Sequence, residues 1–310
     1  MKNTIYYKQV QLLLKLLPLI GKEKDLALKG GTAINLFFRE MPRFSVDIDL
    51  TYLPIADRET SLGGITDALK NIKQNINRLL PKATVTKRAL NNTSYLTGLI
   101  VQENNVLVKI EVNTTIRGAI NPPVEIALSN KASDFFEMDL SVQSLSFEDV
   151  YAGKMCAALD RQHPRDFYDI KLLLENEGIS DNLRKTFMVY LISNNRPIVE
   201  LLNPNRIDIA EVYNQEFAGM TSENVTLDEL LKSRDELISI IHTSLKKDEI
   251  DFLLSFKAKN PKWELLGFSG VENLPSVKWK MLNLNRMDSK KHAEAYNKLE
   301  EFLITLHLMT

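Results

Sequence analysis

The chain has 310 residues, with 39 lysines and arginines against 40 aspartates and glutamates, so its net charge of −1 gives no overall preference for nucleic acid. Its one cysteine, Cys156, excludes an internal disulfide and a cysteine-based zinc site. No apolar run reaches the ~18 residues of a membrane span, and a lysine interrupts the apolar run near the N-terminus, which favours a helix over a signal peptide. We therefore expect a soluble, cytoplasmic protein with no membrane partner.

The first 175 residues or so alternate between strand-like and helix-like segments. In chain order the pattern predicts a helix over 4–20, a strand over 25–29, a helix capped by Thr32 that ends before Pro42, a strand over 45–53, a helix over 57–80, strands over 83–90, 94–103 and 105–114, and helices over 147–160 and 164–176. Strands followed by helices, with one β–α unit at the front, indicate a small α/β or α+β sheet domain.

The rest of the chain is typical of helices. Candidates lie near 181–194, 208–218, 227–244, 248–258 and 287–308, separated by prolines. The change near 175–180 suggests two domains, 1–178 and 179–310, of which the second is mainly α-helical and can serve RNA or a partner protein.

Two carboxylates two residues apart are the most informative feature. Asp47 and Asp49 alternate with Val46, Ile48 and Leu50, so on a strand both carboxylates project from one face. Two such charges repel unless a cation lies between them, and Mg²⁺ prefers one or two carboxylates together with substrate phosphates. The alternative is an edge strand with a solvated acidic face.

A glycine pair precedes this strand by one helix. Gly30, Gly31 and Thr32 lie between the strand over 25–29 and the following helix, where backbone can closely approach a phosphate. Alone, the pair indicates only a tight turn. Followed by one helix and then the D-x-D strand, it predicts a phosphate-binding turn beside a metal-binding strand. Two-metal transfer usually needs a third carboxylate, and Glu111 is the candidate, with a solvated strand face as the alternative.

Charged residues also occur on the two helices over 147–160 and 164–176. Lys154 lies in the apolar stripe of its helix, where it needs an anion such as a nucleotide phosphate, unless it reaches solvent at the edge of the stripe. Asp166 and Asp169 share a helix face, and Arg165 can pair with Asp169 at i,i+4. We interpret Cys156 as a packing residue and His163 as a helix-start residue.

Four blocks in this order resemble one known family. KGGTAINLFF (29–38), RFSVDIDL (43–50), KIEVN (109–113) and the stretch from Lys154 to Asp169 are similar to the AbiEii/AbiGii nucleotidyltransferases, which are toxins of abortive-infection, type IV toxin–antitoxin systems. The resemblance covers about 25–175. It implies a fold like that of DNA polymerase β, with a mixed sheet, flanking helices and a helical C-terminal region. Here Thr32 replaces the serine of the usual Gly-Ser motif.

The resemblance also implies roles for individual residues. By this resemblance Gly31 and Thr32 would bind the phosphates, Asp47 and Asp49 would bind the metal, Mg²⁺, and Lys154 and Asp166 would be the essential lysine and late aspartate, with Asp169 as the rival. Together with the residue patterns, this gives Asp47, Asp49, Lys154 and Asp166 as the expected catalytic residues. Gly30, Gly31, Thr32 and Lys154 are the expected triphosphate-binding residues, and Glu111 is the candidate third metal ligand. Related toxins modify the 3′ end of transfer RNA and block its aminoacylation, and an antitoxin is expected from a neighbouring gene.

A local excess of positive charge supports a nucleic-acid partner. Between Lys257 and Lys291 there are eight basic and three acidic residues, interleaved with Trp263 and Trp279. The alternative is a solvated basic face with two core tryptophans. The leading hypothesis is a Mg²⁺-dependent nucleotidyltransferase that modifies tRNA; the others are transfer to a protein or small molecule, and a non-catalytic binding protein.

Overall fold

The computed structural model describes residues 4–221 and 223–309. The chain forms two compact units. Unit 1 comprises residues up to Val150 together with Gly219–Glu223, and unit 2 comprises Tyr151–Ala218 and the chain from Asn224 onward. Helices α5 and α6, which follow the last strand, thus fall almost wholly in unit 2. None of the helices among the described residues is long and apolar enough to cross a membrane.

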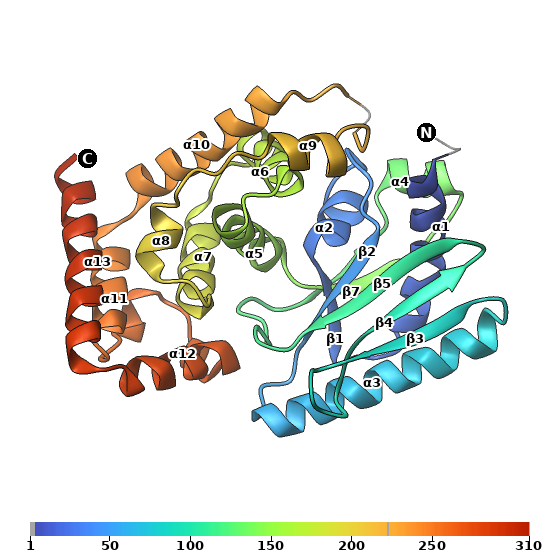
Figure 1. The fold of residues 1–310 in the computed structure, drawn as a ribbon, viewed down its shortest axis with the longest axis horizontal. Helices are drawn as coiled ribbons and strands as arrows, with labels where there is room; N and C mark the ends of the chain where they lie inside the picture. The colour runs from blue at the N-terminus through green and yellow to red at the C-terminus, as the bar shows by residue number, and fades with distance from the viewer. Residues whose placement is uncertain (1–3, 222, 310) are drawn as a thin grey trace. The chain divides into compact units, whose positions relative to one another are not determined.

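Unit 1 is built on a seven-stranded mixed sheet of order β3-β4-β5-β2-β1-β7-β6 (Figure 1). Its strands are β1 (Leu26–Lys29), β2 (Asp47–Tyr52), β3 (Thr84–Ala89), β4 (Leu96–Glu103), β5 (Val106–Asn113), β6 (Val124–Ala127) and β7 (Ser141–Ser144). β2 pairs antiparallel with β1 and parallel with β5, so it is an interior strand. The alternative that Asp47 and Asp49 lie on an edge strand is therefore wrong.

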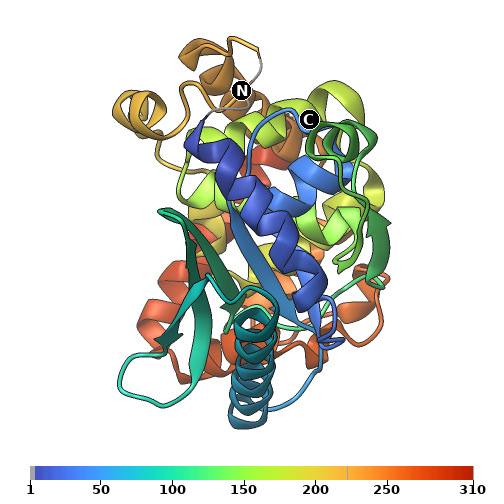
Figure 2. The ribbon, with the colours of Figure 1, turned by 90° about the vertical axis from the view of Figure 1, so that its right-hand side faces the viewer.

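The helices of unit 1 are α1 (Ile5–Ile20), α2 (Gly30–Ala33), the π-helical turn η1 (Ile34–Phe38), α3 (Arg58–Leu79) and α4 (Asn130–Phe136). α1 packs on β5 and on α3, and α3 packs on β4, so these two helices share one face of the sheet (Figure 2). The apolar residues Ile48, Leu50 and Ile110 are buried there, which leaves Asp47 and Asp49 on the opposite face.

Most predicted elements of this part are confirmed, with one correction. β2, α3 and the three strands after it agree with the prediction to within about two residues. Thr32 does not cap its helix: the helix begins at Gly30, two residues earlier, and Lys29 holds the N-cap position. The Thr32 hydroxyl bonds β2 instead, because the turn faces that strand.

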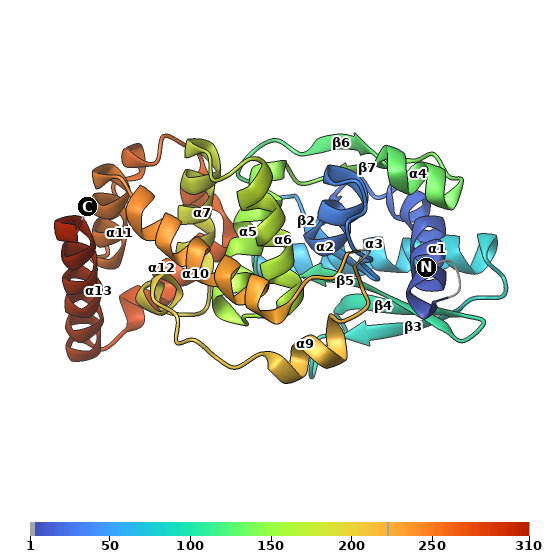
Figure 3. The same ribbon diagram turned by 90° about the horizontal axis from the view of Figure 1, so that it is seen from above.

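Unit 2 is entirely helical within its described residues (Figure 3). Its helices are α5 (Phe147–Asp160, beginning in unit 1), α6 (Pro164–Asn176), α7 (Asp181–Ser193), α8 (Ile198–Leu202), α9 (Ala210–Glu216), α10 (Leu227–Ser244), α11 (Lys247–Lys257), α12 (Pro275–Arg286) and α13 (Ser289–Met309), with short 3₁₀ turns η2 (Trp263–Leu265) and η3 (Val271–Asn273). The predicted helical character is confirmed, and α8 and α12 are additional.

Candidate active site

The glycine turn of unit 1 lies directly against the acidic strand. Gly30 has φ +71°, a conformation that favours glycine, and a Cβ built there would be 2.7 Å from Oδ2 of Asp49. Asp49 is also the register partner of Lys29, the residue before the turn. Turn and acidic strand therefore form one continuous surface.

Hydrogen bonds fix this turn to β2. Thr32 is 1% exposed, and its Oγ1 donates to the carbonyl oxygen of Asp47 at 2.6 Å and lies 3.0 Å from Oγ of Ser45. The Asn35 side-chain amide donates to the carbonyl of Gly31 at 2.9 Å. Because the Thr32 hydroxyl is used within the fold, a phosphate at this turn would be bound by backbone N–H groups.

The three candidate metal ligands lie on two adjacent strands. Asp49 of β2 is the register partner of Glu111 of β5, and Asp47 is the partner of Lys109, so these side chains share one face of the sheet. The Glu111 carboxylate contacts the guanidinium of Arg88 from β3. Gly98 lies between the two in register, and its lack of a side chain lets Arg88 reach across β4.

A metal ion at this surface would depend chiefly on Asp47 and Asp49. In the described part of the chain, no three His, Cys, Asp or Glu side chains are gathered closely enough to hold a metal ion. Two carboxylates with further oxygens from substrate phosphates are nevertheless a donor set that suits Mg²⁺. The fit is therefore to a metal that arrives with the nucleotide, and Glu111 stays a prediction.

Arg43 is a residue of this surface that the sequence reasoning did not single out. Its side chain is buried, with 3% of the residue exposed, and Nη1 donates to the carbonyl of Phe44 at 2.9 Å. A Cβ at Gly31 would be 3.0 Å from Nη2 of Arg43, so a buried cation lies beside the glycine turn. Its position two residues before Ser45 in the RFSVDIDL block was the available signal.

Unit 2 contains a second group of charged residues, on α5 and α6. Lys154 is 7% exposed, and its Nζ donates to Oδ1 of Asp166 at 2.8 Å and lies 3.0 Å from Oδ2 of Asp169. Both aspartates are fully buried. The prediction that Lys154 points inward toward an anion is confirmed, and the alternative of a solvent-reaching lysine is wrong. Within this unit, its anions are the two carboxylates.

Asp166 also binds Arg161, which the sequence reasoning missed. Nε and Nη2 of Arg161 donate to the two carboxylate oxygens of Asp166 at 2.6 and 3.0 Å. Burial alone would raise the pKa of Asp166, but the charge of Lys154 and the bonds from Arg161 outweigh it and hold that pKa far below its usual value. Asp166 is thus ionised at neutral pH. Arg161 follows Lys154 by seven residues, or two helical turns, and that spacing was the available signal.

The start of α6 confirms the structural interpretation of His163. Its Nδ1 accepts the N–H of Arg165 at 3.1 Å, and its Nε2 lies 3.0 Å from Glu216, so the neutral ring caps the helix. Burial lowers the pKa of His163, in agreement with a neutral ring. Arg165 lies 3.3 Å from Glu216, while Asp169 is bound by Lys154. Cys156 is buried, and burial raises its pKa, so it is a packing residue.

The structure thus collects the predicted residues into two groups. Gly30, Gly31, Thr32, Asp47, Asp49 and Glu111 belong to unit 1, whereas Lys154, Asp166 and Asp169 belong to unit 2. A glycine turn placed against two carboxylates on an interior strand of a mixed sheet agrees with the arrangement expected of a nucleotidyltransferase.

Comparison with known proteins identifies the family. Residues 11–263 match the family described as nucleotidyl transferase AbiEii toxin, type IV toxin–antitoxin system, and the chain belongs to this family. Among solved structures it is similar to MenT4, a nucleotidyltransferase toxin from Mycobacterium tuberculosis H37Rv, with a TM-score of 0.60 and 14% identity over 91% of this chain and 95% of that chain. A search of curated proteins gives no match.

Family membership confirms the expected fold and the enzyme class. The chain is a nucleotidyltransferase toxin of the AbiEii type, which implies a nucleoside triphosphate substrate and a cognate antitoxin. Enzymes of this kind generally use a divalent metal ion.

Proposed function

We propose that the protein transfers a nucleoside monophosphate from a nucleoside triphosphate to the 3′ end of tRNA in a Mg²⁺-dependent reaction, and thereby blocks translation. The observation that carries the proposal is how closely Asp49 approaches the glycine turn: a Cβ added at Gly30 would lie only 2.7 Å from Oδ2 of Asp49. Triphosphate and metal ligands would share one surface there.

In this reaction the residues of unit 1 would bind and orient the nucleotide. Backbone N–H groups of Gly30, Gly31 and Thr32 would hold its phosphates, and Asp47 and Asp49 would hold Mg²⁺, which supplies positive charge next to the reacting phosphate. The RNA hydroxyl oxygen forms a bond to the α-phosphorus, the bond between that phosphorus and the bridging oxygen breaks, pyrophosphate leaves and the hydroxyl proton is released. Catalysis would rest mainly on positioning and electrostatics.

The α5–α6 residues would act as a set. Lys154 and Arg161 carry two positive charges, and Asp166 and Asp169 two negative ones, so the group as ionised is neutral. We propose that Lys154 is the essential lysine that the family resemblance implies, and that both aspartates position its ammonium group. Asp166, which also binds Arg161, is the stronger candidate for the late aspartate.

An RNA acceptor is supported by the exposed face of α12 in unit 2. The helix contains Lys278, Lys280 and Arg286 and no acidic residue. Trp279 is 51% exposed and shares its helix face with Arg286, two turns later, while the exposed Lys278 precedes it. Trp263 instead packs against the rings of Phe252 and Phe256. An exposed indole between cations suits stacking on an unpaired base beside a phosphate backbone. One of the two tryptophans is therefore outside the core.

The test is a transfer assay with purified protein, total tRNA, Mg²⁺ and each α-labelled nucleoside triphosphate in turn. Asp47→Ala should abolish labelling of RNA without lowering the melting temperature appreciably, because the side chain lies outside the apolar core. Asp67→Ala, which removes an exposed carboxylate from α3 of the same unit, is the matched control and should transfer normally.

The outcomes separate the alternatives. Wild-type activity in folded Asp47→Ala would refute the assigned site. Label found in protein or in a small molecule, with none in RNA, would replace tRNA as the acceptor. Failure of Mg²⁺ to promote nucleotide binding in a calorimeter would favour the non-catalytic alternative.

A further inference from the structure

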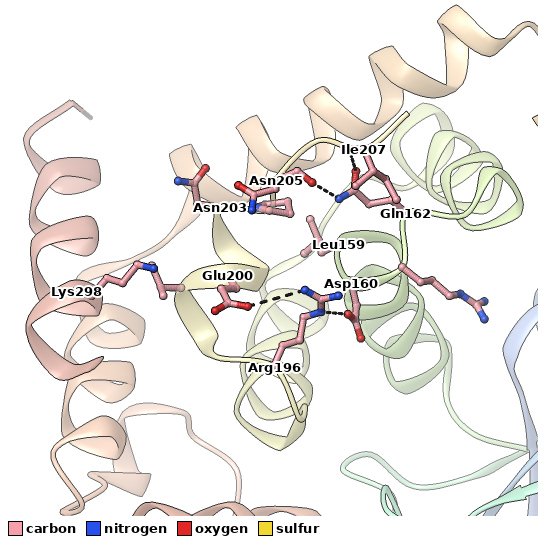
Figure 4. Close-up of a pocket in the computed structure, with 12 residues that line it drawn as sticks. Leu159, Asp160, Gln162, Arg196, Glu200, Asn203, Asn205, Ile207 and Lys298 are labelled. Carbon is pink, nitrogen blue, oxygen red and sulfur yellow. Dashed lines mark hydrogen bonds and ion pairs between the residues drawn. The ribbon is translucent and has the colours of Figure 1, made fainter. Parts of the chain in front are cut away.

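Unit 2 contains a cavity of about 510 Å³ that the proposed reaction does not use. Its wall is formed by the end of α5, by α8, by the loop at 203–207 and by Lys298 of α13 (Figure 4). This volume falls within the roughly 300–1,000 Å³ typical of small-ligand sites.

One wall of the cavity is held in place by a buried glutamine. Gln162 is 3% exposed; its Nε2 donates to the carbonyl of Asn205 at 2.6 Å, and its Oε1 accepts the N–H of Ile207 at 3.3 Å. Arg234, also buried, donates to the carbonyl of Ile207 at 3.2 Å. The loop at 203–207 is therefore fixed to the connection between α5 and α6 and to α10, and the cavity is preformed.

The lining offers three kinds of contact. Asn203 and Asn205 are exposed, and within the described part of the chain neither side-chain amide has a hydrogen-bond partner. Pro204 and Ile207 add apolar surface, and Ile207 is 48% exposed. Amides match the edges of a nucleobase, and apolar side chains match its faces.

The charged side chains that line the cavity differ in whether they already have an ion-pair partner. Arg196 is held by Asp160 and lies 3.9 Å from Glu200, so these three charges largely satisfy one another (Figure 4). Lys298 is exposed and has no ion pair among the described residues. Arg196 supplies one positive charge against the two carboxylates of Asp160 and Glu200, so Lys298 brings this wall to balance, and its ammonium is the group here that can bind a phosphate.

A smaller cavity continues this surface along α8. It measures about 130 Å³ and shares Val199, Glu200 and Lys298 with the larger one, adding Lys257. The two cavities form one groove with Lys298 at their junction. At the other end the groove reaches Arg161, whose guanidinium binds Asp166 of the α5–α6 group.

We propose that this groove binds the single-stranded end of the acceptor RNA, with one nucleobase in the larger cavity against Asn203 and Asn205 and the following phosphate at Lys298. The inference rests on the proposed function and deepens it by locating acceptor recognition. Lys298 lies beyond residues 11–263, the part that matches the family, so this half of the groove is a feature of this chain's C-terminal helices.

The experiment measures binding of a 5′-fluorescein-labelled RNA hexanucleotide to the full chain by fluorescence anisotropy. Lys298→Glu reverses the charge at the junction of the two cavities, and Lys232→Glu reverses an exposed lysine of α10 that lines neither cavity. We expect Lys298→Glu to weaken binding about 10-fold and to reduce the slope of log K against log salt by about 0.7, the value for one phosphate contact on a single strand.

The control and a second variant sharpen the test. Lys232→Glu should change affinity less than about 2-fold, and both variants should bind nucleoside triphosphate like wild type. Asn205→Asp keeps the side-chain shape and should weaken RNA binding by replacing an amide donor with a charge that repels phosphate. A blunt RNA duplex should bind more weakly than the single strand.

Four results would overturn the inference. Lys298→Glu could bind the RNA as tightly as wild type, or Lys232→Glu could lose as much RNA affinity as Lys298→Glu. A blunt duplex could bind as tightly as the single strand, or an acidic peptide of equal charge could displace the RNA. If wild type labels RNA while Lys298→Glu binds RNA normally, the groove fails and the proposed function stands. If the groove binds RNA as expected but no label enters RNA, the proposed function fails and the groove stands.

Discussion

Substituting Gly30 tests whether the glycine turn positions the acidic strand. A Cβ at Gly30 would lie 2.7 Å from Oδ2 of Asp49, whereas ordinary contacts begin at 3.4 Å, so the carboxylate or the turn must move by about 0.7 Å. Misplacement by about 1 Å can cost 10²-fold in rate, so we expect Gly30→Ala to lose about 30- to 100-fold in nucleotide transfer.

A backbone cost accompanies this substitution and needs its own control. Gly30 has φ +71°, and an alanine there costs about 1–2 kcal/mol of stability. Gly178 has φ +67° and no atom within 4 Å of a built Cβ, so Gly178→Ala has the same backbone cost without touching Asp49. Both variants should melt a few degrees below wild type, and only Gly30→Ala should lose transfer.

The assay is the labelled-nucleotide transfer reaction, run beside thermal melting of both variants. Wild-type transfer by Gly30→Ala would refute the positioning argument, because the clash with Asp49 would then have no consequence for the reaction. An equal loss of transfer in Gly178→Ala would refute it too, because the effect would then follow from destabilisation alone.

Two further predictions concern unit 2. Lys154→Met leaves two buried carboxylates without their lysine and should lower the free energy of unfolding, measured by urea titration, by about 3–5 kcal/mol. The control Lys171→Met breaks a surface pair on α6 and should lower it by only about 0.5 kcal/mol. Similar values for the two variants would contradict the buried arrangement. Because burial lowers the pKa of His163, the unfolded chain takes up the proton first as pH falls below about 6.5, so wild type should lose stability from there downward. His163→Asn keeps a capping side chain that does not titrate, and parallel pH curves for it and wild type would contradict this role.

The central part of the fold follows from local patterns. β5 alternates buried and more exposed residues, and β4 is rich in β-branched and other apolar residues. The turn between them consists of Asn104 and Asn105 with φ of 48° and 66°, values that asparagine tolerates well. α5 and α6 have the predicted bounds because Pro164 and the capping residue His163 define where one helix can start.

Other elements are set by distant contacts and leave little local signal. β6 is short and mostly exposed, and it forms a strand because it pairs with β7. β7 in turn pairs with β1, through Ser144 of β7 and Leu28 of β1, which are more than 100 residues apart in the sequence. α12 has no acidic residue and only a narrow buried face. Periodicity alone therefore predicted neither element.

The candidate site shows the same division. Asp47 and Asp49 were predictable because a period of two places both carboxylates on one face of a strand. Their contact with Gly30 was implied only by motif order, and the structure supplies the distance. The bond between Lys154 and Asp166 joins two helices whose sequences specify each partner separately, and only packing determines that the two side chains meet.

Arg43 is an example of a residue near the glycine turn that the order of the sequence motifs could not predict. The residue forms a β-bridge with Thr221, and the N–H of Phe44 donates to the carbonyl of Met220 at 3.2 Å. These partners come from Gly219–Glu223, which follows α9 in sequence but belongs to unit 1. The backbone that places a buried guanidinium beside Gly31 is therefore paired with a segment that follows helices α5 to α9 in the sequence. Since neither segment has a pattern that specifies the other, the glycine turn depends on a long-range pairing that only the folded chain contains.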